Sequence, residues 1–145
     1  MIALASDHAG FELKEKIKIL LDEMRLEYKD FGPQSESSCD YPDFAYPAAM
    51  AVGKGECERA ILTCGSGIGM DMVANKVDGV RSALCGSVEM AELSRRHNDA
   101  NVLSLGGRLT PWKTAESIIK VWLSTQFEGG RHQRRVEKIH ALSGR

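Results

Sequence analysis

Short apolar runs alternate with longer amphipathic stretches about five times along this chain, and this alternation restricts the possible fold more than any other feature. The first run, IALAS at 2–6, is typical of a buried strand, and FELKEKIKILLDEM at 11–24 repeats its apolar side chains with helical spacing. Further strands are predicted at 26–31, 59–64, 80–85 and 101–105. Further helices are predicted at 43–52, from a glycine-rich loop towards Lys76, at 87–96, at 110–124 and at 131–142. Strands that alternate with helices predict an α/β fold in which helices cover both faces of a parallel sheet.

Three helix boundaries depend on particular residues. Ser87 is expected to cap the helix that follows it, because serine is a preferred N-cap. Thr110 is expected to be an N-cap with Pro111 in the first helical position. The helix at 43–52 is expected to form despite Pro47.

The length and charge of the chain exclude several classes of function. The 145 residues fit one domain, 1–145, and a net charge of −1 offers no global attraction to nucleic acid or to an anionic membrane. No window approaches the ~20 apolar residues of a membrane span, and residues 1–6 lack the basic flank of a signal peptide. The four cysteines show neither a CxxC pair nor zinc-ligand spacing. We therefore expect a cytoplasmic protein with reduced thiols and no bound metal.

The segment CGSGIGM at 64–70 follows a predicted strand and precedes a predicted helix. Its glycines, Gly65, Gly67 and Gly69, allow backbone N–H groups to turn inward and form an anion cradle. The segment lacks the Gly-Lys-Ser/Thr of a P-loop, and its glycine spacing fits a dinucleotide fingerprint poorly. Cys64 stands at the mouth of this cradle, where N–H groups stabilise a thiolate. Such a thiolate suits nucleophilic attack or proton abstraction beside a carbonyl, whereas Cys39, Cys57 and Cys85 are interpreted as structural.

Basic and histidine residues form three further groups. Arg131 and Arg135 are four residues apart on one helical face, and two guanidinium groups suit a phosphate dianion, whereas Arg134 is interpreted as solvated. The run from Arg95 to Asp99 ends a predicted helix and contains a histidine and an amide that could serve as a general acid and a hydrogen-bond donor. Asp7-His8 follows the first strand, at the sheet edge where α/β proteins bind their ligands.

Six ordered motifs together resemble the family of type B ribose-5-phosphate isomerases and their galactose-6-phosphate isomerase relatives. The motifs are SDHAGFELK near the start, DYPDFA at 40–45, CGSGIGM at 64–70 with ANK at 74–76, GVRSAL at 79–84, HNDANVLSLGGR at 97–108 and FEGGRHQRRV at 127–136. The resemblance implies a single Rossmann-like, three-layer domain with a five-stranded parallel sheet. It also implies a homodimer, or a dimer of dimers, with the active site at the dimer interface and the helix at 131–142 near that interface.

The resemblance also implies a role for each site residue. Cys64 would be the base that moves a proton between C2 and C1 of ribose 5-phosphate through an enediolate, giving ribulose 5-phosphate. The backbone of Gly65, Gly67 and Gly69 would hold the oxyanion together with Asn98, and Ser66 would help to move protons between the two oxygens. His97 would open the furanose ring, and Asp7 would bind sugar hydroxyls near Tyr41. His8, Arg108, Arg131 and Arg135 would bind the phosphate, and no metal or redox cofactor is required.

One residue departs from the family pattern. Asp71 follows Met70, where a small or neutral polar residue is expected. A carboxylate directed into the site would raise the pKa of the Cys64 thiol and oppose an enediolate. We expect Asp71 to act as a cap or to face solvent instead.

Other functions remain open from the sequence. The substrate could be allose 6-phosphate or galactose 6-phosphate, although the set at 97–99 favours opening of a ribose-type furanose. A sensor that binds sugar phosphates without turnover is a different class of protein, but it would have little need for Cys64 or His97. A thiol hydrolase with Cys64 as nucleophile is a third possibility.

Overall fold

In the computed structural model, which describes all 145 residues, the strands form one parallel sheet in the order β2-β1-β3-β5-β4. The strands are β1 (Ile2–Ser6), β2 (Tyr28–Asp30), β3 (Arg59–Cys64), β4 (Ser82–Leu84) and β5 (Val102–Gly106). Every neighbouring pair is parallel. The predicted α/β fold with a five-stranded parallel sheet is therefore confirmed.

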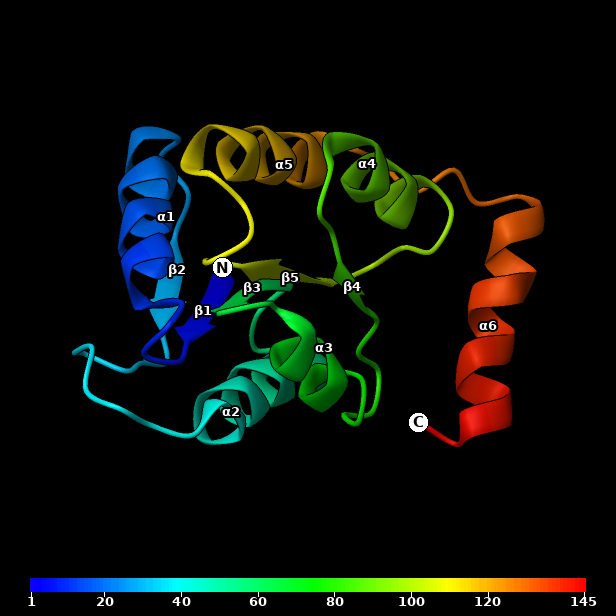
Figure 1. The fold of residues 1–145 in the computed structure, drawn as a ribbon. Helices are drawn as coiled ribbons and strands as arrows, with labels where there is room; N and C mark the ends of the chain where they lie inside the picture. Colours follow the sequence, from blue (N-terminus) through cyan, green and yellow to red (C-terminus); the bar gives the residue numbers. More distant parts are fainter.

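Helices cover both faces of the sheet, so the predicted three layers are present (Figure 1). The helices are α1 (Phe11–Glu23), α2 (Tyr41–Gly53), α3 (Ile68–Ala74), α4 (Val88–Arg96), α5 (Trp112–Ser124) and α6 (Arg131–Ser143). Helices α1, α4 and α5 lie on one face, α2 and α3 lie on the other, and α6 stands beyond the β4 edge (Figure 1). None of these helices has the length and apolar composition that crossing a bilayer requires.

The two faces of the sheet are packed differently. Alternate strand residues point to opposite faces, and those facing α2 and α3 are mostly small. They meet an alanine-rich helix α2 in one core cluster, which includes Ala3, Ala5, Ala60, Ala45, Ala48 and Ala49. On the opposite face, the large strand residues Leu4, Ile61 and Leu103 belong to a second core cluster. Helices α1 and α5 contribute Ile17, Ile118, Ile119 and Trp122 to it. Because both faces are buried, the central strands β1, β3 and β5 are mostly apolar, whereas the edge strand β2 has the sequence YKD.

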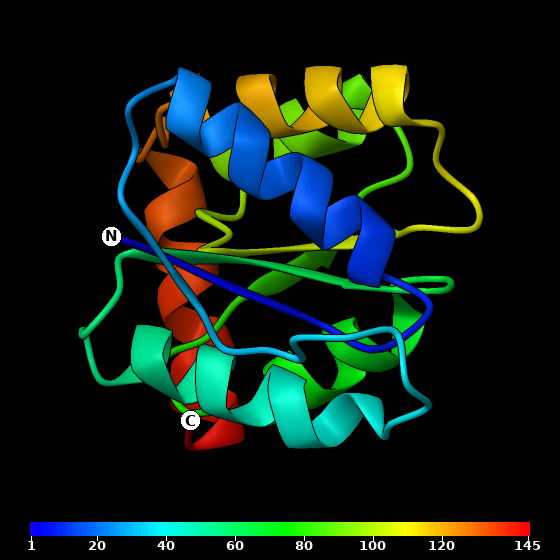
Figure 2. The same ribbon diagram turned by 90° about the vertical axis from the view of Figure 1, so that its left-hand side faces the viewer.

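All five strands end at the same edge of the sheet, and three of the following loops are joined there. In Figure 2 the strands run from the side of the N-terminus towards this edge. The N–H of Gly107 donates to the carbonyl oxygen of Cys64 (2.7 Å), and the N–H of Arg108 donates to that of Gly65 (3.0 Å). Gly10 lies so close to β3 that a Cβ atom there would be 2.4 Å from the backbone of Thr63. The loops after β1, β3 and β5 therefore form one surface.

Some predicted boundaries differ from the structure. The second strand is only three residues long, so Leu26 and Phe31 lie outside it. Thr110 is not the N-cap of α5, because Pro111 occupies that position with an extended ψ of 149°. The prediction for Ser87 is confirmed, since its side chain accepts a hydrogen bond from the N–H of Met90. Helix α2 also forms around Pro47, as expected.

Candidate active site

The loop between β3 and α3 is built around Cys64 and Gly67. Cys64 is the last residue of β3 and is 5% exposed. Gly67 has a φ of +80°, and a Cβ atom there would lie 2.6 Å from Leu84 and 2.8 Å from the backbone of Leu105. Only glycine fits this position, since the conformation is left-handed and no space remains for a side chain.

The same loop directs a backbone donor at the cysteine. The N–H of Gly67 donates a hydrogen bond to the Sγ atom of Cys64 at 3.1 Å. Ser66 adds a second local contact, because its Oγ atom accepts a hydrogen bond from the N–H of Ile68 at 3.2 Å. A donor at this position stabilises a thiolate more than a thiol, so Cys64 is placed for chemistry that needs a thiolate.

Two further residues from distant segments lie against the glycine loop. A Cβ atom on Gly69 would be 2.8 Å from the ring of Tyr41, which begins α2. A Cβ atom on Gly65 would be 3.4 Å from the Cδ atom of Arg108, which follows β5. The glycines therefore leave room for an aromatic ring and a guanidinium group beside Cys64.

Asp7 and His8 follow β1 at the same edge. Asp7 is buried, and its Oδ1 atom accepts a hydrogen bond of 2.9 Å from the N–H of Gly10. The Nδ1 atom of His8 accepts a hydrogen bond of 3.2 Å from the N–H of Cys39. Because Nδ1 is then the acceptor, Nε2 carries the proton and can donate to a ligand.

His8 and Arg108 line a common cleft of about 400 Å³. Its other lining residues are Ala9, Glu12, Leu13, Lys16, Glu36, Gly107, Thr110, Pro111 and Trp112. The cleft thus combines a lysine, an arginine and a histidine donor with two carboxylates. The structure brings together Asp7, His8, Tyr41, Cys64, Gly65, Ser66, Gly67, Gly69 and Arg108 at this edge.

The remaining candidate residues lie elsewhere in the chain. His97 is the C-cap of α4, and residues 98–101 connect it to the first residue of β5. Cys64 pairs with Gly106 at the other end of β5, which is about 13 Å further along the strand. Asn98 lines a separate cleft with residues of α6, and Arg131 and Arg135 are exposed at the start of α6. Figure 2 shows α6 on the side of the N-terminus, away from the glycine loop. A single chain therefore does not bring His97, Asn98, Arg131 and Arg135 to Cys64.

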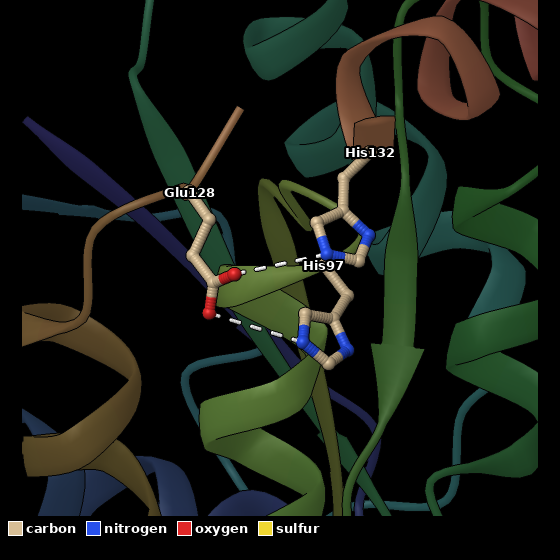
Figure 3. A group of neighbouring side chains, drawn as sticks. All are labelled: His97, Glu128 and His132. Carbon is tan, nitrogen blue, oxygen red and sulfur yellow. Dashed lines mark ion pairs between the residues drawn. The ribbon is translucent and has the colours of Figure 1, made fainter. Parts of the chain in front are cut away.

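His97 belongs to a group of side chains that the sequence did not reveal (Figure 3). Its ring stacks on that of His132, with centroids 4.2 Å apart and planes inclined by 12°. The Nε2 atoms of His97 and His132 lie 3.9 Å and 3.7 Å from different oxygens of Glu128. The Nε atom of Arg96 donates to Glu128 at 2.5 Å, and this hydrogen bond lowers the pKa of the Glu128 carboxyl. No spacing in the sequence links residue 97 to 128 or 132, because α5 lies between them.

This group has the composition of a metal site, since its possible ligand atoms all lie within 4.8 Å of one another. The nearly parallel rings do not suit one ion, because an imidazole binds a metal in its own plane and the two planes do not converge. Arg96 already pairs with the carboxylate of Glu128. The observed arrangement fits an ion-pair and stacking cluster better than a metal centre.

Asp71 is half-buried and contacts β4, so, contrary to our expectation, it neither caps α3 nor lies fully in solvent. Its Oδ1 atom accepts a 2.7 Å hydrogen bond from the hydroxyl of Ser82 in β4, which also lies 3.0 Å from that of Ser104. Burial raises the pKa of Asp71, and the hydrogen bond from Ser82 opposes this effect in part. The carboxylate is therefore engaged by β4 and not by the glycine loop.

Comparisons with known proteins agree with this arrangement. The family model described as Ribose/Galactose Isomerase matches residues 2–139. Ribose-5-phosphate isomerase B of Escherichia coli is 45% identical over 99% of this chain and 97% of its own length. D-erythrulose-4-phosphate isomerase of Pectobacterium atrosepticum is 42% identical over 95% of this chain and 91% of its own length.

Solved structures show the same fold. Ribose-5-phosphate isomerase B of Clostridium thermocellum superposes with a TM-score of 0.97 at 45% identity, covering 99% of this chain and 97% of that one. The enzyme of Mycoplasma genitalium, solved with bound ribulose-5-phosphate, gives a TM-score of 0.94 at 42% identity, covering 99% and 95%. With this much of its length shared, the chain belongs to the ribose/galactose isomerase family and is an aldose–ketose sugar-phosphate isomerase of the ribose-5-phosphate isomerase B type.

Proposed function

We propose that this enzyme interconverts ribose 5-phosphate and ribulose 5-phosphate, with Cys64 as the base. The observation that carries the proposal is the hydrogen bond from the Gly67 N–H to the Cys64 Sγ atom, at the mouth of a glycine loop. The thiolate removes the C2 proton of the open-chain aldose. The electrons of the C2–H bond form a C1–C2 double bond, and the π electrons of the carbonyl move onto O1 to give an enediolate. Return of the proton to C1 gives the ketose.

The enediolate oxygens need donors that do not have to reorganise during the reaction. We assign this role to the backbone N–H groups of Gly65, Gly67 and Gly69, of which that of Gly67 is shared with the Cys64 Sγ atom, and to the side-chain amide of Asn98. The hydroxyl of Ser66 transfers a proton between the two oxygens. These assignments follow the resemblance to the family, and the compact loop around Cys64 supports those that lie within one chain.

Phosphate binding holds the sugar so that C1 and C2 face the thiolate. We assign it to His8, Arg108, Arg131 and Arg135. The Nε2–H of His8 and the guanidinium of Arg108 share the cleft beside the glycine loop, which supports the first half of this set. Asp7 and Tyr41 bind the sugar hydroxyls between the phosphate and the reacting carbons.

A second copy of the chain completes the site in this proposal. Arg131, Arg135, His97 and Asn98 lie far from Cys64 in their own chain, so a partner subunit must supply them if they act there. Apolar side chains of α3 and α6 are exposed, which supports contact between copies along these helices; they are Ile68, Met72, Ile139 and Leu142. We therefore propose a homodimer, alone or paired into a tetramer, with α6 at the interface.

The choice of sugar is a matter of pocket size and ring opening. Allose 6-phosphate and galactose 6-phosphate are the six-carbon candidates, and the Pectobacterium relative is named for a four-carbon substrate. A sugar-phosphate sensor is the remaining alternative, but a thiol held by a backbone donor at 3.1 Å favours catalysis.

The test is an isomerase assay on ribose 5-phosphate, allose 6-phosphate, galactose 6-phosphate and erythrulose 4-phosphate, in the presence of EDTA. We expect ribose 5-phosphate to give the highest kcat/KM, and Cys64→Ala to abolish its turnover. Faster turnover of another sugar would reassign the substrate. Binding without turnover of any of the four would favour the sensor.

A further inference from the structure

The His97 ring is held by a second histidine that does not face the solvent itself. The His132 side chain is 9% exposed, whereas that of His97 is 37% exposed. The two rings are nearly parallel, with centroids 4.2 Å apart, so His132 covers one face of His97 and restricts its rotation. A ligand can thus reach His97, while His132 lies behind it.

Glu128 fixes the direction in which both rings point. One carboxylate oxygen faces each Nε2 atom, as Figure 3 shows. Arg96 holds the carboxylate through its Nε atom, and Glu92 pairs with the same guanidinium. The Nδ1 atom of His97 makes no hydrogen bond within the chain and remains free to meet a substrate.

The surroundings of the pair disfavour a proton on His132. Two stacked imidazolium ions would repel each other at 4.2 Å. Burial, the facing His97 ring, Arg131 and Arg135 lower the pKa of His132, against the attraction of Glu128. These influences disfavour a charged His132 ring, so its part in the pair is to cover one face of His97.

We propose that His132 is a positioning residue for His97 and that its contribution is confined to opening of the sugar ring. The inference rests on the proposed function, in which His97 is the general acid of that step. During ring opening the C1–O4 bond breaks, His97 gives a proton to O4, and the C1 hydroxyl loses its proton to water to form the aldehyde. The stacked His132 ring keeps the His97 ring oriented for this transfer.

The chemistry of the two sugars separates ring opening from proton transfer at carbon. Ribose 5-phosphate is largely a furanose and must be opened before Cys64 can act. Ribulose 5-phosphate is acyclic, because the oxygen that would close its furanose carries the phosphate. Exchange of its C1 proton with solvent therefore needs the enediolate step but no ring opening.

The experiment measures both reactions in three variants of the full chain. His132→Ala removes the stacked ring, His132→Phe keeps a flat ring without nitrogens, and Arg134→Ala is an exposed control on the same helix. Turnover of ribose 5-phosphate gives kcat and KM, and NMR in D2O gives the rate of C1 proton exchange of ribulose 5-phosphate. Thermal unfolding and sedimentation check that each variant is folded and associated like the wild type.

We expect His132→Ala to lower kcat for ribose 5-phosphate by about tenfold or more, with its KM and the C1 exchange rate changed by less than about twofold. His132→Phe should recover most of kcat, and Arg134→Ala should match the wild type. Unchanged kcat in His132→Ala, an equal loss in both reactions, or a phenylalanine variant as slow as the alanine variant would overturn the proposal. A wild-type enzyme inactive in both reactions would instead reject the proposed function.

Discussion

The backbone N–H of Gly67 donates a hydrogen bond of 3.1 Å to the Sγ atom of Cys64. This contact exists because Gly67 adopts a φ of +80°, which turns the chain back over the end of β3. The same conformation starts α3 at the next residue. One glycine thus joins the end of a buried strand, the start of a helix and the environment of the proposed base.

Replacement of Cys64 should remove catalysis while sparing binding. Cys64→Ala eliminates the base, and we expect kcat for ribose 5-phosphate to fall by roughly 10²- to 10⁴-fold. Calorimetric binding of ribose 5-phosphate should remain within about threefold of the wild type, since the phosphate contacts are elsewhere. Cys57→Ala is the matched control, because Cys57 is buried just before β3, at the end of that strand opposite the glycine loop. Turnover retained in Cys64→Ala would show that another group is the base.

Substitution of Gly67 should cost more stability than the same change at Gly55. The φ angle is +80° at Gly67 and +75° at Gly55. A Cβ atom at Gly67 would contact Leu84 and Leu105, whereas a Cβ atom at Gly55 would have nothing within 4 Å. Gly55→Ala should lower the free energy of unfolding by about 1–2 kcal/mol, through backbone strain alone. Gly67→Ala should lower it by about 3 kcal/mol or more, through strain and overlap together. Denaturant titration of both variants measures the difference, and equal losses would mean that the loop shifts freely.

The sequence predicted the sheet well because its strands are buried on both faces. Runs such as IALAS and RAILTC have no polar alternation and no alternative period, so they indicate interior parallel strands. The edge strand β2 was predicted too long, since only Tyr28–Asp30 pair with β1, and the apolar residues Leu26 and Phe31 that extended the pattern lie outside the strand. The N-cap of α5 was predicted at Thr110, one residue before its observed position, because Pro111 has an extended ψ and not a helical one.

The site was predictable only in part. The residues after β1, β3 and β5 could be placed together from topology, because carboxyl ends of parallel strands share an edge. The family resemblance placed Tyr41 near Asp7, but only the structure shows that its ring fills the space that Gly69 leaves. Glu128 and His132 were missed, since their approach to His97 depends on where α5 and the following segment end. Local sequence contains no signal for such a contact.

Asp71→Asn should stabilise the enzyme near neutral pH. Burial raises the pKa of Asp71 in the folded state above the 3.8 of an ordinary aspartate, so the folded chain holds this proton to higher pH than the unfolded chain. The stability that Asp71 contributes is thus lost as the pH rises through the window above 3.8, and the loss persists at neutral pH. Asparagine can still accept the hydrogen bond from Ser82, without a buried charge.

Thermal unfolding of Asp71→Asn and wild type between pH 3 and pH 8 measures this effect. We expect the difference in Tm to favour the variant at neutral pH and to shrink towards about pH 3. Asp78→Asn, which changes an exposed carboxylate, is the control. Activity should stay within about twofold of the wild type, since Asp71 faces Ser82. A large change in kcat would place the carboxylate close to the reacting thiol.

Removal of Arg131 should weaken substrate binding. A charged hydrogen bond to phosphate contributes about 1.5–3 kcal/mol, so KM should rise by roughly 10- to 100-fold in Arg131→Ala. Arg135→Ala should behave similarly, because both side chains project from one face of α6. Arg134 lies between them in the sequence and projects from another face of α6, so Arg134→Ala should leave KM unchanged. Steady-state kinetics with ribose 5-phosphate tests all three, and a rise in KM for Arg134→Ala alone would reverse the assignment.

Mixed dimers test whether two chains share one site. His97 and Cys64 lie near opposite ends of β5 in one chain, so we expect each active site to combine Cys64 of one subunit with His97 of the other. In a dimer of one Cys64→Ala chain and one His97→Ala chain, one site then carries both substitutions and the other carries neither. Random pairing gives such dimers half of the time, so the mixture should recover about one quarter of wild-type activity. Each variant alone should be nearly inactive on ribose 5-phosphate.

A second mixture controls for any general effect of mixing. His97→Ala and Arg131→Ala both alter the contribution of the same chain to the site of its partner, so every site in their mixed dimer carries one substitution. That mixture should recover no activity beyond the average of its components. Co-expression of differently tagged chains, followed by purification through both tags, isolates each mixed dimer, and the isolated first dimer should then show about half of wild-type activity. Equal recovery in the two mixtures, or none in the first, would mean that each chain forms its site alone.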